Sequence, residues 1–277
     1  MKVGVSLAGG GIRGIAHVGV LKALEEKNIK VAAIAGTSAG SIIATLYAMG
    51  YSPYYIYLLF KRYARDIINI RSKPIINGIT NFIRNNKIGI AGLSDGNEFE
   101  KMYDELARKK GFRLIGDIKM PLLVSAVDIG ESKEYIFTNC ASRKNIKDNY
   151  ITEIGRAVRA SSSFPAIFCP CEYKNHIFMD GGVLNNLPTE ELKKVYTGKI
   201  ISVNFESDPV YNDYDIMNII MKTLDIMGNK LSINSLKKSD FVLTVPTDGT
   251  GLIDVDKMDI CYKYGYEIAI KNIDKIR

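Results

Sequence analysis

Residues 2–14 read KVGVSLAGGGIRG, and residues 31–40 read VAAIAGTSAG. Each stretch begins with a short apolar run, Lys2–Leu7 or Val31–Ala35, that is typical of a buried strand. Each then passes through glycines into a longer segment with helical spacing. A strand that is followed directly by a turn and a helix, twice in succession, predicts βαβ units and a parallel sheet.

The rest of the chain continues this alternation of strands and helices. Further strands are predicted at Leu122–Ala126, His176–Met179, Ile200–Asn204 and Phe241–Val245. Further helices are predicted at Asn97–Lys110, Tyr150–Ala160, Thr189–Val195, Asp215–Leu236 and Asp256–Ile276. Residues 51–95 interrupt the alternation, and we interpret them as an inserted helical cap. The predicted fold class is α/β: a single domain with a mainly parallel central sheet that is covered by helices on both faces.

Composition excludes several classes of protein. The chain has 277 residues, of which 47% are hydrophobic and 24% charged, as a folded domain requires and a disordered or collagen-like chain does not provide. No uncharged apolar run reaches the ~18 residues that are needed to span a bilayer. Residues 1–11 lack the apolar core and the cleavage site of a signal peptide. We therefore expect a cytoplasmic protein.

The cysteines do not predict a metal site. Cys169 and Cys171 form a C-x-C pair without a second close pair, and His176 is the only histidine near them. Because a zinc site normally uses four well-spaced ligands, partly buried reduced thiols are the simpler interpretation, also for Cys140 and Cys261. We expect no metal.

The formal net charge of +7 is concentrated in one segment. Between Tyr51 and Ile90 a single acid, Asp66, stands against the basic residues Lys61, Arg62, Arg65, Arg71, Lys73, Arg84 and Lys87. Cations among tyrosines and phenylalanines suit a peripheral contact with an anionic membrane, here its inner face, and a solvated helical flap is the open alternative. Nucleic-acid binding is not expected, because no recognised binding motif accompanies the charge.

The first motif lies at the turn after the first strand. Gly9, Gly11 and Gly14 satisfy G-x-G-x-x-G, the dinucleotide-binding pattern, between a strand and a helix. A dinucleotide site also needs an acidic residue at the end of the second strand, where this chain has Gly36-Thr37-Ser38. Consecutive backbone N–H groups at a helix start bind any negative oxygen, including the oxyanion of acyl transfer.

The second motif is Gly36-Thr37-Ser38-Ala39-Gly40, which matches G-x-S-x-G, the strand-to-helix turn that exposes a nucleophilic serine. Its position between a predicted strand and a predicted helix is the context that this motif requires. A histidine base is not expected, because His17 precedes the motif inside a helix and His176 has apolar neighbours in a strand. Ser38 is the predicted nucleophile.

The third motif, Asp180-Gly181-Gly182, follows a predicted strand. An aspartate at the carboxyl end of a strand points into the crevice where open α/β sheets bind ligands. An aspartate that only caps its own turn is the alternative. Burial beneath an acyl chain would raise the pKa of this carboxyl and make it a better base.

In this order the three motifs resemble the patatin-like phospholipase family. The likeness extends over the blocks LAGGGIRGIAHVGVL (7–21), RASSSFPAIF (159–168) and MDGGVLNNLP (179–188), and it covers about residues 2–195. It implies that residues 1–195 are the catalytic core, with the inserted cap at 51–95 within it. We expect the strands and helices of residues 196–277 to complete the same domain. The likeness also implies an acyl-ester hydrolase of the phospholipase A or lysophospholipase kind, without metal or other cofactor.

The resemblance further implies a role for each motif residue. Ser38 and Asp180 would form a catalytic dyad that works through an acyl-serine, and the Gly10 and Gly11 N–H groups would hold the oxyanion. Gly9 and Arg13 would shape that oxyanion loop. The supporting residues would be Gly14, Gly36, Gly40, Gly181 and Gly182.

Two other functions stay open at this point. One is a nucleotide-binding oxidoreductase built on the glycine loop, and the other is a lipid-binding regulator without useful turnover. The expected partner is a phospholipid or other acyl ester, whereas the sequence leaves the oligomeric state open.

Overall fold

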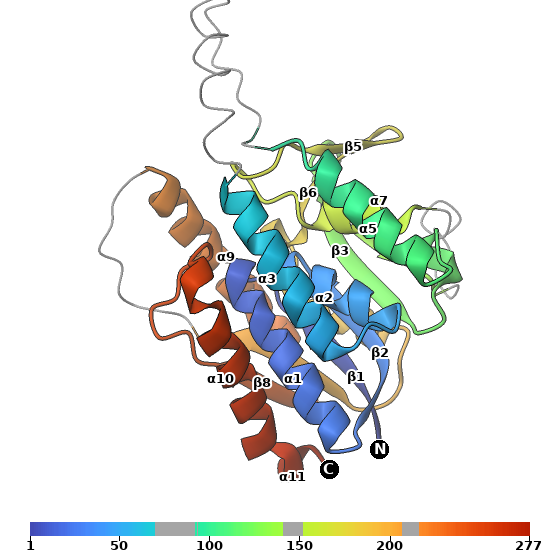
Figure 1. Ribbon diagram of the computed structural model, residues 1–277, viewed down its shortest axis with the longest axis vertical. Coiled ribbons are helices and arrows are strands. Elements are labelled where there is room, and N and C mark those ends of the chain that lie inside the picture. Colours follow the sequence, from blue (N-terminus) through green and yellow to red (C-terminus); the bar gives the residue numbers. More distant parts are fainter. Residues whose placement is uncertain (70–91, 93, 141–151, 207–215) are drawn as a thin grey trace, which may run out of the picture.

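The computed structural model contains the whole chain, and the structure describes residues 1–69, 92, 94–140, 152–206 and 216–277. Within these residues, eight strands form one mixed sheet in the order β5-β6-β3-β2-β1-β7-β8, with β4 paired to β3 (Figure 1). The strands are β1 (Lys2–Leu7), β2 (Lys30–Thr37), β3 (Leu122–Asp128), β4 (Lys133–Thr138), β5 (Cys171–Tyr173), β6 (His176–Asp180), β7 (Ile200–Phe205) and β8 (Phe241–Val245).

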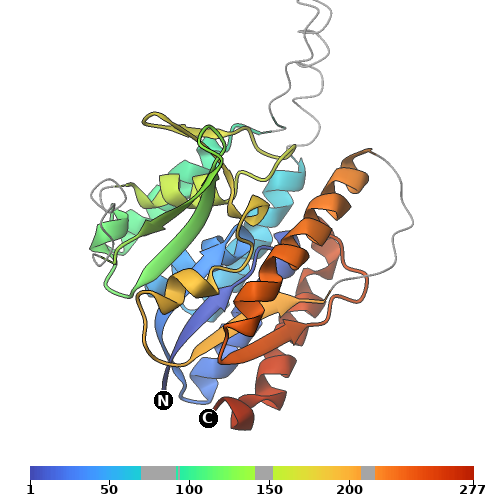
Figure 2. The same ribbon diagram turned by 180° about the vertical axis from the view of Figure 1, so that it is seen from behind.

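Helices cover both faces of this sheet (Figures 1 and 2). One face carries α1 (Ile15–Glu26), α2 (Ala39–Ala48), α3 (Pro53–Asn69), α5 (Asn97–Lys109), α7 (Ile154–Ser161) and α10 (Met258–Lys271). The other face carries α8 (Thr189–Lys193) and α9 (Ile216–Lys237). A short last helix, α11 (Ile273–Ile276), follows α10.

The predicted fold class is confirmed, with helices on both sides of the sheet of a single domain. The five strands β3, β2, β1, β7 and β8 run parallel, but β4 and β6 run antiparallel to β3, and β5 to β6. The strands β4 and β5 were not predicted from the sequence. β4 begins with partly exposed charged residues, and β5 has only three residues, which is too short to display an apolar period.

The segment after residue 196 contributes β7 and β8 to the sheet and α10 to the helical layer. α10 packs closely against α1, because each helix has a glycine where the two cross: Gly19 in α1 and Gly265 in α10. A Cβ atom at Gly19 would clash with the carbonyl of Tyr262, and one at Gly265 would clash with Ala16. This close packing holds α1, and with it the glycine loop at the start of that helix.

The predicted cap at 51–95 is described only in part, since residues 70–91 and 93 lie outside the described residues. Its first part is α3, which packs against α1 and α2. Lys61 of α3 forms an ion pair with Asp259 at 2.6 Å, so this cation is already neutralised within the fold. None of the described helices combines the length and the apolar character that crossing a membrane requires.

Candidate active site

Two strands that end beside β3 bring the predicted nucleophile and the predicted base together. β2 runs parallel to β3, and its last residue, Thr37, lies opposite Ser125. β6 runs in the other direction, and its last residue, Asp180, lies opposite Ala126, the next residue of β3. Because the carboxyl ends of β2 and β6 point toward each other, Ser38, which follows β2, comes next to the carboxyl of Asp180.

Ser38 occupies a strained turn between β2 and α2. Its backbone has φ 53° and ψ −123°, a conformation that costs a residue with a side chain roughly 1–3 kcal/mol. Gly36 and Gly40 allow the turn, because a Cβ at Gly36 would clash with the backbone of Gly40. Gly14 packs directly against the first residue of α2. The N–H of Ser38 donates a hydrogen bond to Ser161 Oγ at 3.0 Å, which holds the turn in place.

The glycine loop presents two unused backbone donors beside Ser38. The N–H groups of Gly9 and Ile12 donate to backbone carbonyls at 3.0 and 2.9 Å. Between them, the N–H groups of Gly10 and Gly11 donate no hydrogen bond to any described residue. The three glycines and Ser38 line one cavity. Since backbone N–H groups without a partner are rare in a folded protein, this pair suits a negatively charged oxygen.

Asp180 is almost fully buried, and its carboxyl is only half satisfied. Oδ1 accepts a hydrogen bond from the N–H of Gly182 at 2.8 Å. Oδ2 is buried and accepts no hydrogen bond of ordinary geometry from the described residues. Burial raises the pKa of Asp180 to about 6, although the hydroxyl of Ser38 and the N–H of Gly182 lower it. Gly181 packs against the carbonyl of Ser125, where a Cβ would clash.

The loop after Asp180 connects all three motifs. The carbonyl of Asn186 accepts the hydrogen bond from the N–H of Gly9 in the glycine loop, at 3.0 Å. The carbonyl of Asn185 accepts one from the hydroxyl of Thr37, the residue before Ser38, at 2.9 Å. The three motifs are therefore fixed relative to one another by hydrogen bonds as well as by strand pairing.

A buried ion pair ties the glycine loop to α9. The guanidinium of Arg13, which is 3% exposed, meets the carboxylate of Asp225 at 2.5 Å. Nε of Arg13 also donates to the carbonyl of Gly10 at 3.3 Å, and the guanidinium lies over the ring of Phe205. Arg13 thus holds the carbonyl side of the loop, which leaves the N–H groups of the loop for the cavity.

Two cavities meet at Ser38. The first has about 700 Å³ of empty space, part of which is open to solvent, and its surface is almost entirely apolar. Its lining includes Ile42, Phe60, Ala64, Phe164, Ile167, Phe168 and Met221. The second has about 500 Å³ of empty space, also partly open to solvent, and it is lined by the glycine loop, Asp180, Asn186 and one side of α9. An acyl chain fits the chemistry of the first cavity, whereas the second combines polar groups with apolar side chains such as Phe164 and Leu224.

Neither histidine forms a triad with Ser38. His17 is buried in α1, where its Nε2 donates to the carbonyl of Ala8 at 2.8 Å. Burial lowers the pKa of His17 to about 4, so the ring is neutral at pH 7. Nδ1 of His176 lies 2.5 Å from Oδ2 of Asp128. The titratable group that lies beside the Ser38 hydroxyl is the carboxyl of Asp180.

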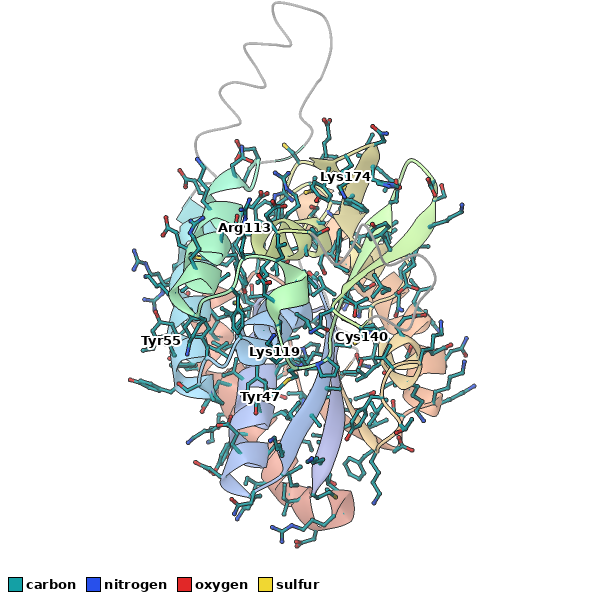
Figure 3. All side chains as sticks on the ribbon, turned by 90° about the vertical axis from the view of Figure 1, so that its right-hand side faces the viewer. Tyr47, Tyr55, Arg113, Lys119, Cys140 and Lys174 are labelled. Carbon is teal, nitrogen blue, oxygen red and sulfur yellow. The ribbon has the colours of Figure 1, made fainter. Side chains whose placement is uncertain are left out.

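One group of side chains could in principle ligate a metal ion. Asp128, Glu131 and His176 have ligand atoms within 4.8 Å of one another, and no second group of this kind is found in the described parts of the chain. The carboxylate of Asp128 already bonds His176 and the N–H of Gly130, which satisfies it without a cation. The four cysteines form no disulfide, and Cys140 lies two residues after the end of β4 (Figure 3).

A model of the patatin-like phospholipase family matches residues 5–193. The chain belongs to the patatin-like phospholipase family. All three motifs lie within the matched residues, and so do the strands β2, β3 and β6 that bring Ser38 and Asp180 together.

Several known proteins resemble this patatin-like chain over most of its length. It is 28% identical to the lysophospholipase NTE1 of Meyerozyma guilliermondii, over 96% of this chain but 19% of that protein. It is 29% identical to YqhO of Bacillus subtilis, over 78% of each chain. It is 32% identical to the probable lipid hydrolase 463L of invertebrate iridescent virus 6, over 70% of this chain and 64% of that protein.

Solved structures share the fold at low sequence identity. VipD from Legionella pneumophila superposes with a TM-score of 0.55 at 14% identity, over 99% of this chain and 66% of VipD. One chain of the ExoU–SpcU complex from Pseudomonas aeruginosa gives 0.55 at 20% identity, over 99% of this chain and 51% of that chain. At these identities the similarity concerns the fold alone.

Two residues around the site were not assigned a role from the sequence. The hydroxyl of Ser161 accepts the hydrogen bond from the N–H of Ser38. Its membership of the block RASSSFPAIF was a signal that could have drawn attention to it. Asp225 had no such signal, because it is 212 positions from Arg13 and outside every motif.

The buried carboxyl of Asp180 should make stability depend on pH. Folding raises the pKa of Asp180 from 3.8 to about 6. Between these pH values the folded state binds more protons than the unfolded state, so the free energy of unfolding falls as the pH rises from about 4 to about 6. Asp180→Asn avoids that loss and should raise the free energy of unfolding by about 3 kcal/mol at pH 8 and by little at pH 3. Urea unfolding at both pH values measures the difference.

Asp117→Asn is the control of opposite sign. Hydrogen bonds from the N–H groups of Leu114 and Arg113 lower the pKa of Asp117, so this variant should lose stability at pH 8. An Asp180→Asn variant whose stability gain is the same at pH 3 and pH 8 would contradict the assignment of a raised pKa.

The two ion pairs that involve Asp225 and Asp259 should differ strongly in their effect on stability. Asp225→Asn leaves a buried guanidinium without its counter-charge and should cost about 3–5 kcal/mol. Asp259→Asn removes an exposed partner of Lys61 and should cost about 1 kcal/mol or less. Guanidinium chloride unfolding of both variants provides the comparison, and equal costs would show that the Arg13 pair is not a structural tie.

Proposed function

We propose that this chain hydrolyses the acyl ester bond of a lipid with a dyad of Ser38 and Asp180, through an acyl-serine intermediate. The observation that carries the proposal is the arrangement of three groups in one cavity. The Ser38 hydroxyl lies beside the buried carboxyl of Asp180, and both share the cavity with the unused N–H groups of Gly10 and Gly11.

In the first half of the reaction, Ser38 Oγ attacks the carbonyl carbon of the ester while its proton passes to Asp180. The carbonyl oxygen becomes an oxyanion, which the N–H groups of Gly10 and Gly11 stabilise. The positive end of α2, which begins at Ala39 directly after Ser38, favours the same charge. When the tetrahedral intermediate collapses, the carbon–oxygen bond to the alcohol breaks and Asp180 protonates the departing alkoxide.

In the second half, water replaces the alcohol. Asp180 removes a proton from the water, whose oxygen attacks the carbonyl carbon of the acyl-serine. Collapse of this second intermediate breaks the bond to Ser38 Oγ, which takes the proton back from Asp180. The products are a free fatty acid and the resting enzyme, so the cycle is balanced without a cofactor.

The pKa of Asp180 suits this role. A carboxyl with a pKa near 4 binds a proton too weakly to remove one from a serine hydroxyl efficiently. Burial raises the pKa of Asp180 to about 6, which keeps it ionised at pH 7 and makes it a stronger base. Oδ2, which accepts no ordinary hydrogen bond from the described residues, is the oxygen left for the proton.

A lipid ester is the substrate class that the two cavities support. The apolar cavity would take the acyl chain and the second cavity the alcohol side, with the ester over Ser38. The names of the relatives, a lysophospholipase and a probable lipid hydrolase, point in the same direction. A peripheral contact with an anionic membrane through the basic residues of 51–90 stays a prediction.

An activated serine can be tested by covalent labelling. A fluorophosphonate ester should add one phosphonyl group to Ser38, as peptide mass spectrometry of the intact chain and of Ser38→Ala would reveal. Labelling should slow by about 10²–10⁴-fold in Asp180→Asn, which lacks the general base. The wild-type rate should rise with pH, with its midpoint near pH 6, because Asp180 must lose its proton to act.

Absence of labelling on the wild type, where a control serine hydrolase reacts fully, would overturn the dyad. A label that persists at the same rate in Asp180→Asn would instead leave Ser38 as a nucleophile and remove Asp180 from the mechanism.

The apolar cavity should determine the length of acyl chain that is accepted. Ala64 of α3 lines the cavity and is 6% exposed, so Ala64→Phe places a ring inside it. For p-nitrophenyl esters of long acyl chains, kcat/KM should fall by about fourfold for each methylene that the ring excludes from the cavity. The kcat/KM for p-nitrophenyl acetate should stay unchanged. An equal loss for short and long esters would mean that the acyl chain binds elsewhere.

A further inference from the structure

α9 has one face that builds the site and another that faces outward. Its inner face provides Met221 to the apolar cavity and Leu224, Asp225 and Gly228 to the second cavity. Its outer face carries large apolar side chains that are at least two-fifths exposed: Ile219, Ile226, Met227, Leu231 and Ile233. In Figure 2, α9 crosses the front of the molecule, and no other described helix or strand lies in front of it.

The outer face has a regular pattern. Ile219, Ile226 and Ile233 follow one another at intervals of seven residues, so they lie along one side of the helix. Lys230 and Lys237 follow two of these isoleucines by four residues, one turn further on. A row of apolar side chains interleaved with lysines is typical of a helix that lies in the surface of a bilayer.

The orientation of α9 is fixed by its inner face. Asp225, the one carboxylate of the helix, is bound to the buried Arg13. Gly228, Ser232 and Ser235 are also buried against the domain. The helix cannot turn its isoleucines inward without breaking this buried ion pair, so the exposed apolar row is a property of the folded domain.

The charge on the outer face is positive. Asp225 is directed inward, and Lys230 and Lys237 form no ion pair with any described residue. An anionic surface therefore complements this face better than a neutral or cationic one. Lysines can extend their ammonium groups toward phosphates while their methylenes lie along apolar surface.

The outer face is continuous with the entrance of the site. Met227 is 45% exposed and also lines the cavity that contains Ser38 and Asp180. Leu184, in the loop that follows Asp180, is exposed as well. A lipid beside α9 would therefore have an apolar path from the surface to Ser38.

We infer that the outer face of α9, with Ile219, Ile226 and Ile233 at its centre and Lys230 and Lys237 beside them, docks on the surface of an anionic lipid bilayer. This inference rests on the proposed lipid-ester hydrolysis for its purpose, but the docking itself is measurable without turnover. The surface differs from the basic segment 51–90, and it opens directly onto the cavity of Ser38.

Co-sedimentation with vesicles tests the inference. Vesicles of phosphatidylglycerol and phosphatidylcholine in equal parts are mixed with the Ser38→Ala chain, which should not consume the lipid. Adding Ile219→Asp or Ile226→Asp should weaken binding by about tenfold each, because an isoleucine then no longer transfers into apolar surroundings. Lys230→Gln and Lys237→Gln should each weaken it by about fivefold on these vesicles, and by little on pure phosphatidylcholine.

Ile129→Asp is the matched control. Ile129 is 44% exposed, compared with 48% for Ile219 and 52% for Ile226, and it lies in the turn between β3 and β4, outside α9. This variant should bind vesicles like the unmodified chain. Equal loss of binding for Ile129→Asp and Ile226→Asp would overturn the inference.

Two further measurements separate the alternatives. In the Ser38-containing chain, Ile219→Asp and Ile226→Asp should leave the hydrolysis of p-nitrophenyl acetate unchanged, which shows that the site has folded. Light scattering detects self-association: a dimer that Ile226→Asp dissociates, with vesicle binding unchanged, would assign the face to a second copy and overturn the inference. Ester hydrolysis without vesicle binding would refute docking alone, and vesicle binding without labelling of Ser38 would refute the proposed hydrolysis alone.

Discussion

The site depends on one constraint, which is that β3 pairs with two strands that meet end to end along the same edge. β2 ends opposite Ser125 and β6 ends opposite Ala126, while β4 occupies the other edge of β3. A parallel strand and an antiparallel strand thus direct their carboxyl ends at the same point. Since β2 is followed by Ser38 and β6 ends in Asp180, the pairing register itself sets the distance between the two side chains. A shift of one residue in either pairing would turn one of these side chains to the other face of the sheet.

The groups that meet there are individually unfavourable for folding. Ser38 has a positive φ, Asp180 is a buried carboxyl, and two backbone N–H groups of the glycine loop have no partner among the described residues. Such features persist only where the surroundings hold them in place. Here the hydrogen bonds to Ser161 and Asn186 and the ion pair of Arg13 provide that support. These polar features coincide in one place, which is what a site prepared for a negatively charged transition state requires.

α9 connects the interior of this site with its outside. On one side Asp225 binds Arg13 and so fixes the helix relative to the glycine loop. On the other side the isoleucines and lysines form the proposed docking face, and Met227 belongs to both the surface and the cavity. The same ion pair that positions the loop therefore also determines which side chains of α9 point outward. The position of α9 therefore affects both the proposed access of lipid to Ser38 and the geometry of the glycine loop beside it.

The sequence by itself determined the fold class, the order of the three motifs and the identity of the candidate nucleophile and base. This was possible because the turns that carry the motifs are short and local. Their glycines, Gly36, Gly40 and Gly181, stand where neighbouring backbones leave no room for a Cβ, and glycines at these spacings can be recognised in the sequence. The shortage of histidines, likewise, could be counted directly. Tertiary structure alone decided the antiparallel strands β4 and β5, the contact of Ser161 with Ser38, and the pairing of Arg13 with Asp225. Asp225 lies 212 residues from Arg13, and no local preference specifies a partner at that separation, because only the packing of α9 against the sheet brings the two charges together.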